Sequence, residues 1–112
     1  MKNAVLEAEK RGRRITELRE SANMSKREFA RTLGISPAYV VYLENGQRSN
    51  GTVLDPSDHM LMMICHKFGV SYSWLKDGEG KRYSSLRQKL IADLVDMPDD
   101  KLPKVKDFFN SL

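Results

Sequence analysis

The sequence predicts an all-α fold, and three observations lead to this prediction. Apolar residues recur with helical spacing along most of the 112-residue chain, Ser residues precede several of these stretches as helix caps would, and no segment reads as a convincing strand. A chain of this length forms about one domain of ordinary size. We therefore expect one helical core, with little chain left for a second.

The charge of the chain is distributed unevenly. Charged residues make up 30% of the chain, and the mean hydropathy is −0.53, as in soluble proteins. Residues 1–54 contain 10 Lys/Arg against 6 Asp/Glu, whereas residues 55–112 contain 9 of each, so the net charge of +4 lies in the first half. A one-sided basic excess indicates an anionic partner such as nucleic acid.

No targeting or membrane segment is evident in the sequence. No apolar run approaches the roughly 20 residues of a membrane-spanning helix, and no apolar stretch follows the charged N-terminus as in a signal peptide. The single cysteine, Cys65, excludes an internal disulfide. We therefore expect a protein of the reducing cytoplasm.

The first helix is expected from Asn3 to Ser21, a stretch rich in good helix formers. Ile15, Leu18 and Ala22 stand at i, i+3 and i+7, so they form its apolar face. A basic run accompanies this helix, and we favour a solvated helix face over an arm that reaches DNA. The run consists of Lys2, Lys10, Arg11, Arg13 and Arg14.

Two short helices should follow. Ser25, with Glu28 three residues later, forms the capping box that begins the second helix, and Gly34 ends that helix. Ser36 and Pro37 begin the third helix as its N-cap and first helical residue. The residues expected to pack these two helices together are Phe29, Ala30, Leu33, Val40 and Leu43.

Two further helices are expected after a polar loop at Gln47–Asp55. Pro56 and Ser57 open the fourth helix, and Ser71 caps a short fifth one. The turn Asp77–Gly80 then marks a domain boundary. The apolar residues of these two helices are Leu61, Ile64, Cys65, Phe68, Trp74 and Leu75.

Residues 25–46 have the features of a helix-turn-helix. The turn Leu33-Gly34-Ile35 joins two short helices, and Gly34 tolerates the positive φ that the turn requires. At 100° per residue, one side of the second helix carries Val40, Leu43 and Glu44, and the opposite side is exposed. Exposed residues near the start of this helix would meet base edges in the major groove. The candidate base-reading residues are Pro37, Ala38, Val41 and Tyr42.

The segments SKREFARTLGISPAYVVYLENGQR and FGVSYSWLKDGEG resemble the Cro/CI-type helix-turn-helix family of phage and bacterial repressors, also called the xenobiotic-response-element family. The resemblance spans roughly residues 15–80 and implies a five-helix, lambda-repressor-like DNA-binding domain. We therefore divide the chain into a DNA-binding domain at residues 1–80, with its motif at 25–46, and a C-terminal two-helix extension at 81–112.

The resemblance also implies roles for single residues. Arg19 and Glu44 match a pair that usually forms a partly buried salt bridge between the first and third helices. Cys65 stands where the family usually has alanine, which implies a packed thiol. The residues expected at the DNA backbone, from the resemblance or from their place beside the motif, are Lys26, Arg27, Tyr39, Asn45, Gln47 and Arg48.

The chain departs from the family in two respects. Many relatives carry hydrogen-bonding side chains on the recognition face, whereas direct readout here would rest on thymine methyl contacts by Ala38 and Val41 and on the Tyr42 hydroxyl. DNA shape would then supply more of the specificity. The loop at residues 47–55 is also several residues longer than usual. Arg48 and Asn50 in it either reach phosphate or belong to a mobile, inert loop.

Residues 81–112 should form a helical hairpin with more apolar surface than two short helices can bury alone. We expect this surface to join two copies of the chain, because a two-fold dimer presents two recognition helices about 34 Å apart, one turn of DNA. The residues expected at the dimer interface are Leu90, Leu94, Phe108, Phe109 and Leu112.

The predicted function is that of a sequence-specific DNA-binding regulator of transcription, a repressor that binds a palindromic operator as a homodimer. The alternative is a protein-interaction module, such as the antitoxin of a toxin–antitoxin pair or a co-regulator. No nucleophile–base pair or phosphate loop indicates an enzyme. The spacing of His59, Cys65 and His66 does not suit zinc, and we expect no cofactor, metal, small-molecule ligand or membrane partner.

Overall fold

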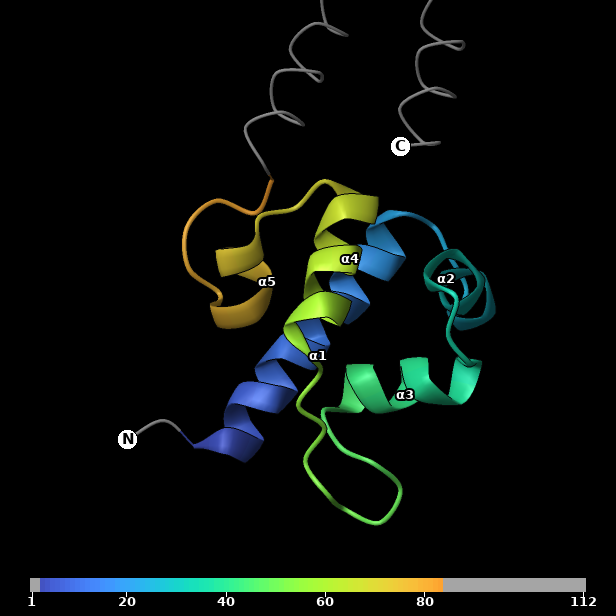
Figure 1. Cartoon of the computed structure of the whole chain (residues 1–112), viewed down its shortest axis with the longest axis vertical. Helices are drawn as coiled ribbons and strands as arrows, with labels where there is room; N and C mark the ends of the chain where they lie inside the picture. Colours follow the sequence, from blue (N-terminus) through green and yellow to red (C-terminus); the bar gives the residue numbers. More distant parts are fainter. Residues whose placement is uncertain (1–2, 84–112) are drawn as a thin grey trace, which may run out of the picture.

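The computed structural model describes residues 3–83, which form five helices (Figure 1). The helices are α1 Ala4–Ser21, α2 Lys26–Leu33, α3 Pro37–Asn45, α4 Asp58–Phe68 and α5 Tyr72–Asp77. Between residues 3 and 83, β pairing is limited to two isolated bridges, so the predicted all-α class is confirmed there. None of these helices has the length and apolarity that crossing a membrane would require. The predicted C-terminal hairpin lies outside the described residues from residue 84 onward.

Side-chain caps begin four of these helices, and left-handed glycines end several of them. The capping residues are Asn3, Ser25, Ser36 and Ser57. The predicted capping box is present, because the Ser25 hydroxyl accepts from the Glu28 N–H at 3.1 Å and the Glu28 carboxylate accepts from the Ser25 N–H at 3.2 Å. Ser71 precedes α5 as predicted, but its hydroxyl donates to the carbonyl of Lys81 and does not cap the helix.

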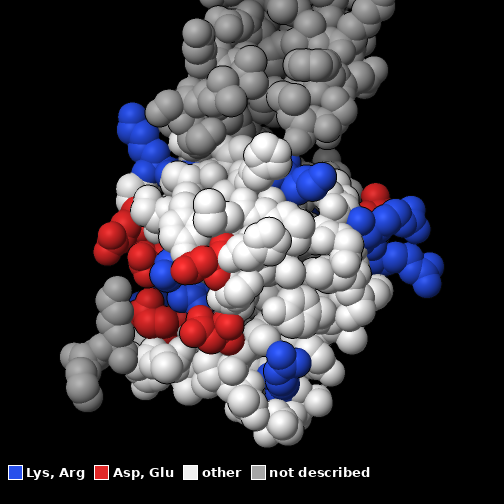
Figure 2. All heavy atoms as spheres, in the orientation of Figure 1, with Lys and Arg blue, Asp and Glu red and all other residues white. Residues whose placement is uncertain are grey.

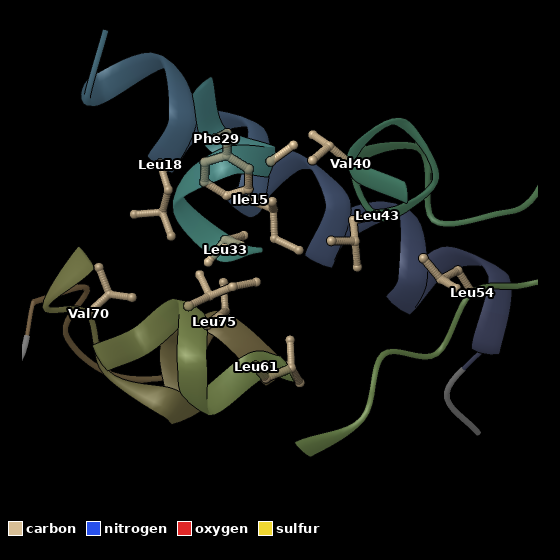
Figure 3. Close-up of a cluster of buried hydrophobic side chains, with 12 residues drawn as sticks. Ile15, Leu18, Phe29, Leu33, Val40, Leu43, Leu54, Leu61, Val70 and Leu75 are labelled. Atoms are coloured by element: carbon tan, nitrogen blue, oxygen red, sulfur yellow. The ribbon is translucent and has the colours of Figure 1, made fainter. Parts of the chain in front are cut away.

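All five helices contribute to one hydrophobic core (Figure 3). Phe29 of α2 is fully buried, and its ring stacks on Phe68 of α4 with centroids 5.2 Å apart. The predicted apolar face of α1 is correct at Ile15 and Leu18. It is wrong at Ala22, which follows the last helical residue and is exposed. The helices are therefore held together by the periodic apolar positions that predicted them.

α1 and α3 cross with no side chain between their backbones. A Cβ atom added at Gly12 would lie 2.2 Å from the carbonyl oxygen of Glu44, closer than real Cβ atoms come to backbone. Gly46, which ends α3 with a φ of 75°, meets α1 in the same way, since a Cβ there would lie 2.7 Å from the Ala8 carbonyl. The small residues Ala8 and Gly12 on α1 therefore allow α3 to rest directly on that helix.

Two residues of the basic run bind the end of α5. Arg14 donates from Nε to the Leu75 carbonyl at 3.0 Å and from Nη2 to the Lys76 carbonyl at 2.9 Å, and Arg11 Nε donates to the same Lys76 carbonyl at 3.2 Å. Carbonyls in the last turn of a helix have no intrahelical donor. Burial, and next the charge of Arg11, lower the pKa of Arg14. The expected solvated face is therefore wrong for Arg11 and Arg14, which stabilise the fold.

Cys65 is a half-buried residue of α4 that packs against the core. Burial raises the pKa of its thiol to about 11. The thiol is therefore protonated at neutral pH and acts as a small apolar side chain, as a packed thiol should.

The substitution Gly12→Ala tests the close crossing of α1 and α3. Alanine inside a helix is normally about 1 kcal/mol more favourable than glycine, but here the added methyl group would collide with the α3 backbone. We expect overpacking to outweigh propensity and the free energy of unfolding to fall by about 1–3 kcal/mol in urea denaturation of the full chain.

The control for this prediction is Arg13→Ala, at the exposed next position of α1. It should change the free energy of unfolding by less than about 0.5 kcal/mol. A Gly12→Ala chain as stable as the original would mean that the two helices are not in close contact.

Candidate nucleic-acid interface

α3 buries one face and presents the other outward, as the helical wheel predicts. Its buried residues are Val40, Leu43 and Glu44. Three of the predicted base-reading residues lie on the other side, where Ala38 is exposed and Val41 and Tyr42 are half-buried. The fourth, Pro37, is exposed at the start of the helix and flanks this side. The rings of Tyr39 and Tyr42 pack partly against the core, so packing fixes how both side chains leave the helix.

The turn before α3 sets where this outward face begins. Gly34 ends α2 in the left-handed region with a φ of 70°, which bends the chain toward the next helix. The Ser36 hydroxyl then accepts from the Tyr39 N–H at 3.1 Å, and Pro37 occupies the first turn. Pro37 and Ala38 therefore lie at the very start of α3, where a recognition helix approaches base edges.

A buried ion pair joins α1 to the last turn of α3. Arg19 Nε donates to Oε1 of Glu44 at 2.9 Å, and Arg19 Nη1 donates to the Met24 carbonyl at 3.0 Å. The Arg19 and Glu44 side chains are only 13% and 5% exposed, so salt screens the pair weakly. Removing one partner of such a pair typically costs about 3–5 kcal/mol, because the other charge stays buried. The expected pair is therefore present and holds α3 on α1.

α2 carries several cationic side chains, whereas α3 carries none. Figure 2 shows Lys and Arg gathered at the edge of the molecule where α2 lies, and Asp and Glu gathered on the side of α1 and α5. Lys26, Arg27 and Arg31 of α2 are exposed, and such side chains suit contacts to phosphate. Sequence analysis missed Arg31, although it stands one helical turn after Arg27 on the same face.

The loop after α3 folds as a short hairpin, which we call the finger (residues 47–53). Gln47 and Val53 form an antiparallel bridge at its base. The Arg48 N–H donates to the Thr52 carbonyl at 2.8 Å, and the Gly51 N–H donates to the Arg48 carbonyl at 2.9 Å. Gly51 has a φ of 84°, which closes the turn. The loop therefore has a defined, hydrogen-bonded shape.

The chain after the finger is anchored to the body of the protein. Leu54 is buried, and its N–H donates to the Gly46 carbonyl at 3.0 Å. Asp55 forms an ion pair with Arg11 at 3.5 Å. The expectation of a polar loop is therefore wrong at residue 54. Figure 1 shows the finger projecting from the end of α3 beyond the helices.

The predicted contact residues fall into three groups along one surface feature, the α2–α3–finger segment. Base-reading candidates occupy α3, Lys26 and Arg27 lie at the start of α2, and Asn45, Gln47 and Arg48 lie where α3 meets the finger. All except Tyr39, Val41 and Tyr42 are exposed, and these three are half-buried. The arrangement suits a helix that enters a groove between two polar flanks.

Comparison with known proteins identifies the family and the fold of this domain. A family model described as "Helix-turn-helix domain" matches residues 12–81. Among solved structures, the chain is similar to the SinR protein/SinI protein complex at 22% sequence identity, with a TM-score of 0.52 over 87% of this chain and 91% of that chain. The comparison with curated proteins gave no match. At this identity the structural likeness supports the fold alone.

Proposed function

The chain belongs to the helix-turn-helix domain family, as its sequence predicted, and we propose that it regulates transcription by placing α3 in the major groove of a specific DNA sequence. Repression follows if the bound site overlaps a promoter, because the protein then occupies the DNA that the polymerase needs. The proposal assigns base contacts to Pro37, Ala38, Val41 and Tyr42, and salt-dependent affinity to the flanking polar residues.

The observation that carries this proposal is the outward face of α3 between two polar flanks. Among residues 3–83 this face is exposed at Ala38 and half-buried at Val41 and Tyr42, while Val40, Leu43 and Glu44 hold its opposite side in place. Exposed Lys26, Arg27 and Arg31 lie on the helix before it, and exposed Arg48 lies in the finger after it. Contacts from such flanks to phosphates position a recognition helix without reading sequence.

Substitution of one residue from each group separates affinity from specificity. Lys26→Ala should weaken binding to all duplexes alike and lower the slope of log affinity against log salt by about 1. Tyr42→Phe removes only a hydroxyl group and keeps the packed ring, so it should relax sequence preference by about 1 kcal/mol. Fluorescence anisotropy with a duplex selected from a random library, and with an unrelated duplex, measures both effects. Identical effects of the two variants on both duplexes would contradict the assigned roles.

A second candidate function is a protein-interaction module, and one observation favours it. α3 contains no Lys or Arg, and its outward face is largely apolar; contiguous exposed apolar patches often mark protein-interaction sites. The solved structure similar to this chain is a complex of the SinR protein with the SinI protein. The same library selection distinguishes the two functions, because a protein-interaction module would enrich no duplex.

We also propose that the protein binds its site as a homodimer through residues 84–112. The motivation is the apolar surface of two short predicted helices, which a second copy of the chain would cover. Residues 81–83 stay with the DNA-binding domain in this proposal. The Arg82 guanidinium carbon lies 4.9 Å from the centroid of the Trp74 ring, and Tyr83 forms an isolated antiparallel bridge with Val70.

A chain that ends at Tyr83 tests the dimer. Sedimentation should show a dimer for the full chain and a monomer for the shortened chain, and the shortened chain should bind DNA more weakly. The control is Met62→Ser in the full chain, since Met62 of α4 is the most exposed large apolar side chain among residues 3–83, at 60%. A shortened chain that still sediments as a dimer, or a Met62→Ser chain that sediments as a monomer, would contradict this interface.

A further inference from the structure

The hydroxyl groups of Tyr39 and Tyr42 are the only hydrogen-bonding groups among the side chains of the first two turns of α3. Between Pro37 and Tyr42 there is no amide, carboxylate, ammonium or guanidinium group. The preceding polar side chain, Ser36, is held at the helix end by its capping bond to the Tyr39 N–H. Asn45 is exposed but stands at the last helical residue. The bidentate contacts by which Arg reads guanine and Asn or Gln reads adenine are therefore unavailable to these two turns.

Besides these two hydroxyl groups, the outward face of α3 offers methyl groups. Ala38 is exposed and Val41 is half-buried one turn later, so the two side chains are neighbours on the same face. Neither side chain loses much conformational freedom when it contacts a base, because alanine has no rotamers and β-branched valine keeps one preferred χ1 in a helix. Buried Val40 and Leu43 prevent the helix from rotating to present another face.

Base edges in the major groove carry only one apolar group that matches such a surface. It is the C5-methyl group of thymine, which other DNA-binding proteins contact through Ala, Thr and Phe side chains. A cytosine methylated at C5 carries the same group at the same place on the pyrimidine ring. An apolar reader therefore responds to the methyl group and is less sensitive to which pyrimidine carries it.

We propose that the outward face of α3 reads the C5-methyl groups of pyrimidines, through Ala38 and Val41, so that thymine and 5-methylcytosine are both accepted where unmethylated cytosine is not. This inference rests on the proposed function and names the chemical group that provides its specificity. Readout of this kind makes the affinity of the protein for its site depend on cytosine methylation.

Single-base replacement in a selected duplex tests this inference on the full chain. Each thymine is replaced in turn by deoxyuridine, which removes only the methyl group. At the contacted positions we expect affinity to fall about fourfold, the fold-change that corresponds to ~0.8 kcal/mol per buried CH₂. Cytosine at these positions should bind weakly, and 5-methylcytosine should recover a similar factor over cytosine.

Two variants assign the effect to α3. Val41→Ala should bring the ratio of affinities for thymine and uracil close to one at a single position. This is the position at which the methyl groups of Val41 contact the base. Lys26→Ala is the matched control, because it should lower affinity for every duplex and leave that ratio unchanged. Circular dichroism and urea denaturation show whether both variants keep the fold.

The outcomes separate this inference from the function on which it rests. Binding of a selected duplex with equal affinity for thymine and uracil at every position would overturn methyl readout and leave DNA binding intact. A thymine preference that Val41→Ala alters at no position would overturn the role of Val41 in methyl readout. A full chain that selects no duplex at all would overturn the proposed function, and methyl readout with it.

Discussion

The backbones of α1 and α3 touch, and the rest of the domain is arranged around this contact. Gly12 leaves room for the carbonyls of Leu43 and Glu44, and Gly46 leaves room for Ala8. The Arg19–Glu44 ion pair closes the same crossing at its other end. This close contact and the ion pair set the orientation of α3 on α1, and with it the direction of its outward face. A recognition surface needs this kind of preorganisation to discriminate among similar sites.

Charge and shape are divided between different elements of this surface. The exposed cations lie on α2 and in the finger, whereas α3 is uncharged on its outward face. Three other arginines of the basic first half serve the fold: Arg11 and Arg14 bind the end of α5, and Arg19 pairs with Glu44. The basic excess of the sequence therefore overstates the charge available to DNA. Affinity and specificity would come from separate side chains, which is why the two can be measured separately.

Local signals in the sequence predicted the helices well, because capping and apolar periodicity act within a few residues. Ser25, Gly34 and Ser36 mark real helix ends, and Phe29 and Leu33 are buried as expected. The resemblance to a known family added the Arg19–Glu44 pair, which residue spacing could not have given.

Features that depend on contacts between distant residues were not predictable in the same way. The role of Gly12 appears only when α3 lies against it, and Arg11 and Arg14 look solvated until the carbonyls of α5 reach them. The bonds that give the finger its hairpin shape, from Arg48 to Thr52 and from Gly51 to Arg48, join backbone groups, which the side chains do not reveal. The Asn50 side chain adds one bond by accepting from the Thr52 N–H at 3.0 Å. Buried Leu54 was the one signal that part of this loop belongs to the core.

The most direct test of the central claim, that α3 and its two flanks form the DNA-binding surface, is a titration of the ¹⁵N-labelled full chain with a selected duplex. The largest amide shift changes should fall at residues 25–27 and 36–48, with small changes in α5. Shift changes centred on α4 or α5, with α3 unaffected by saturating duplex, would contradict it.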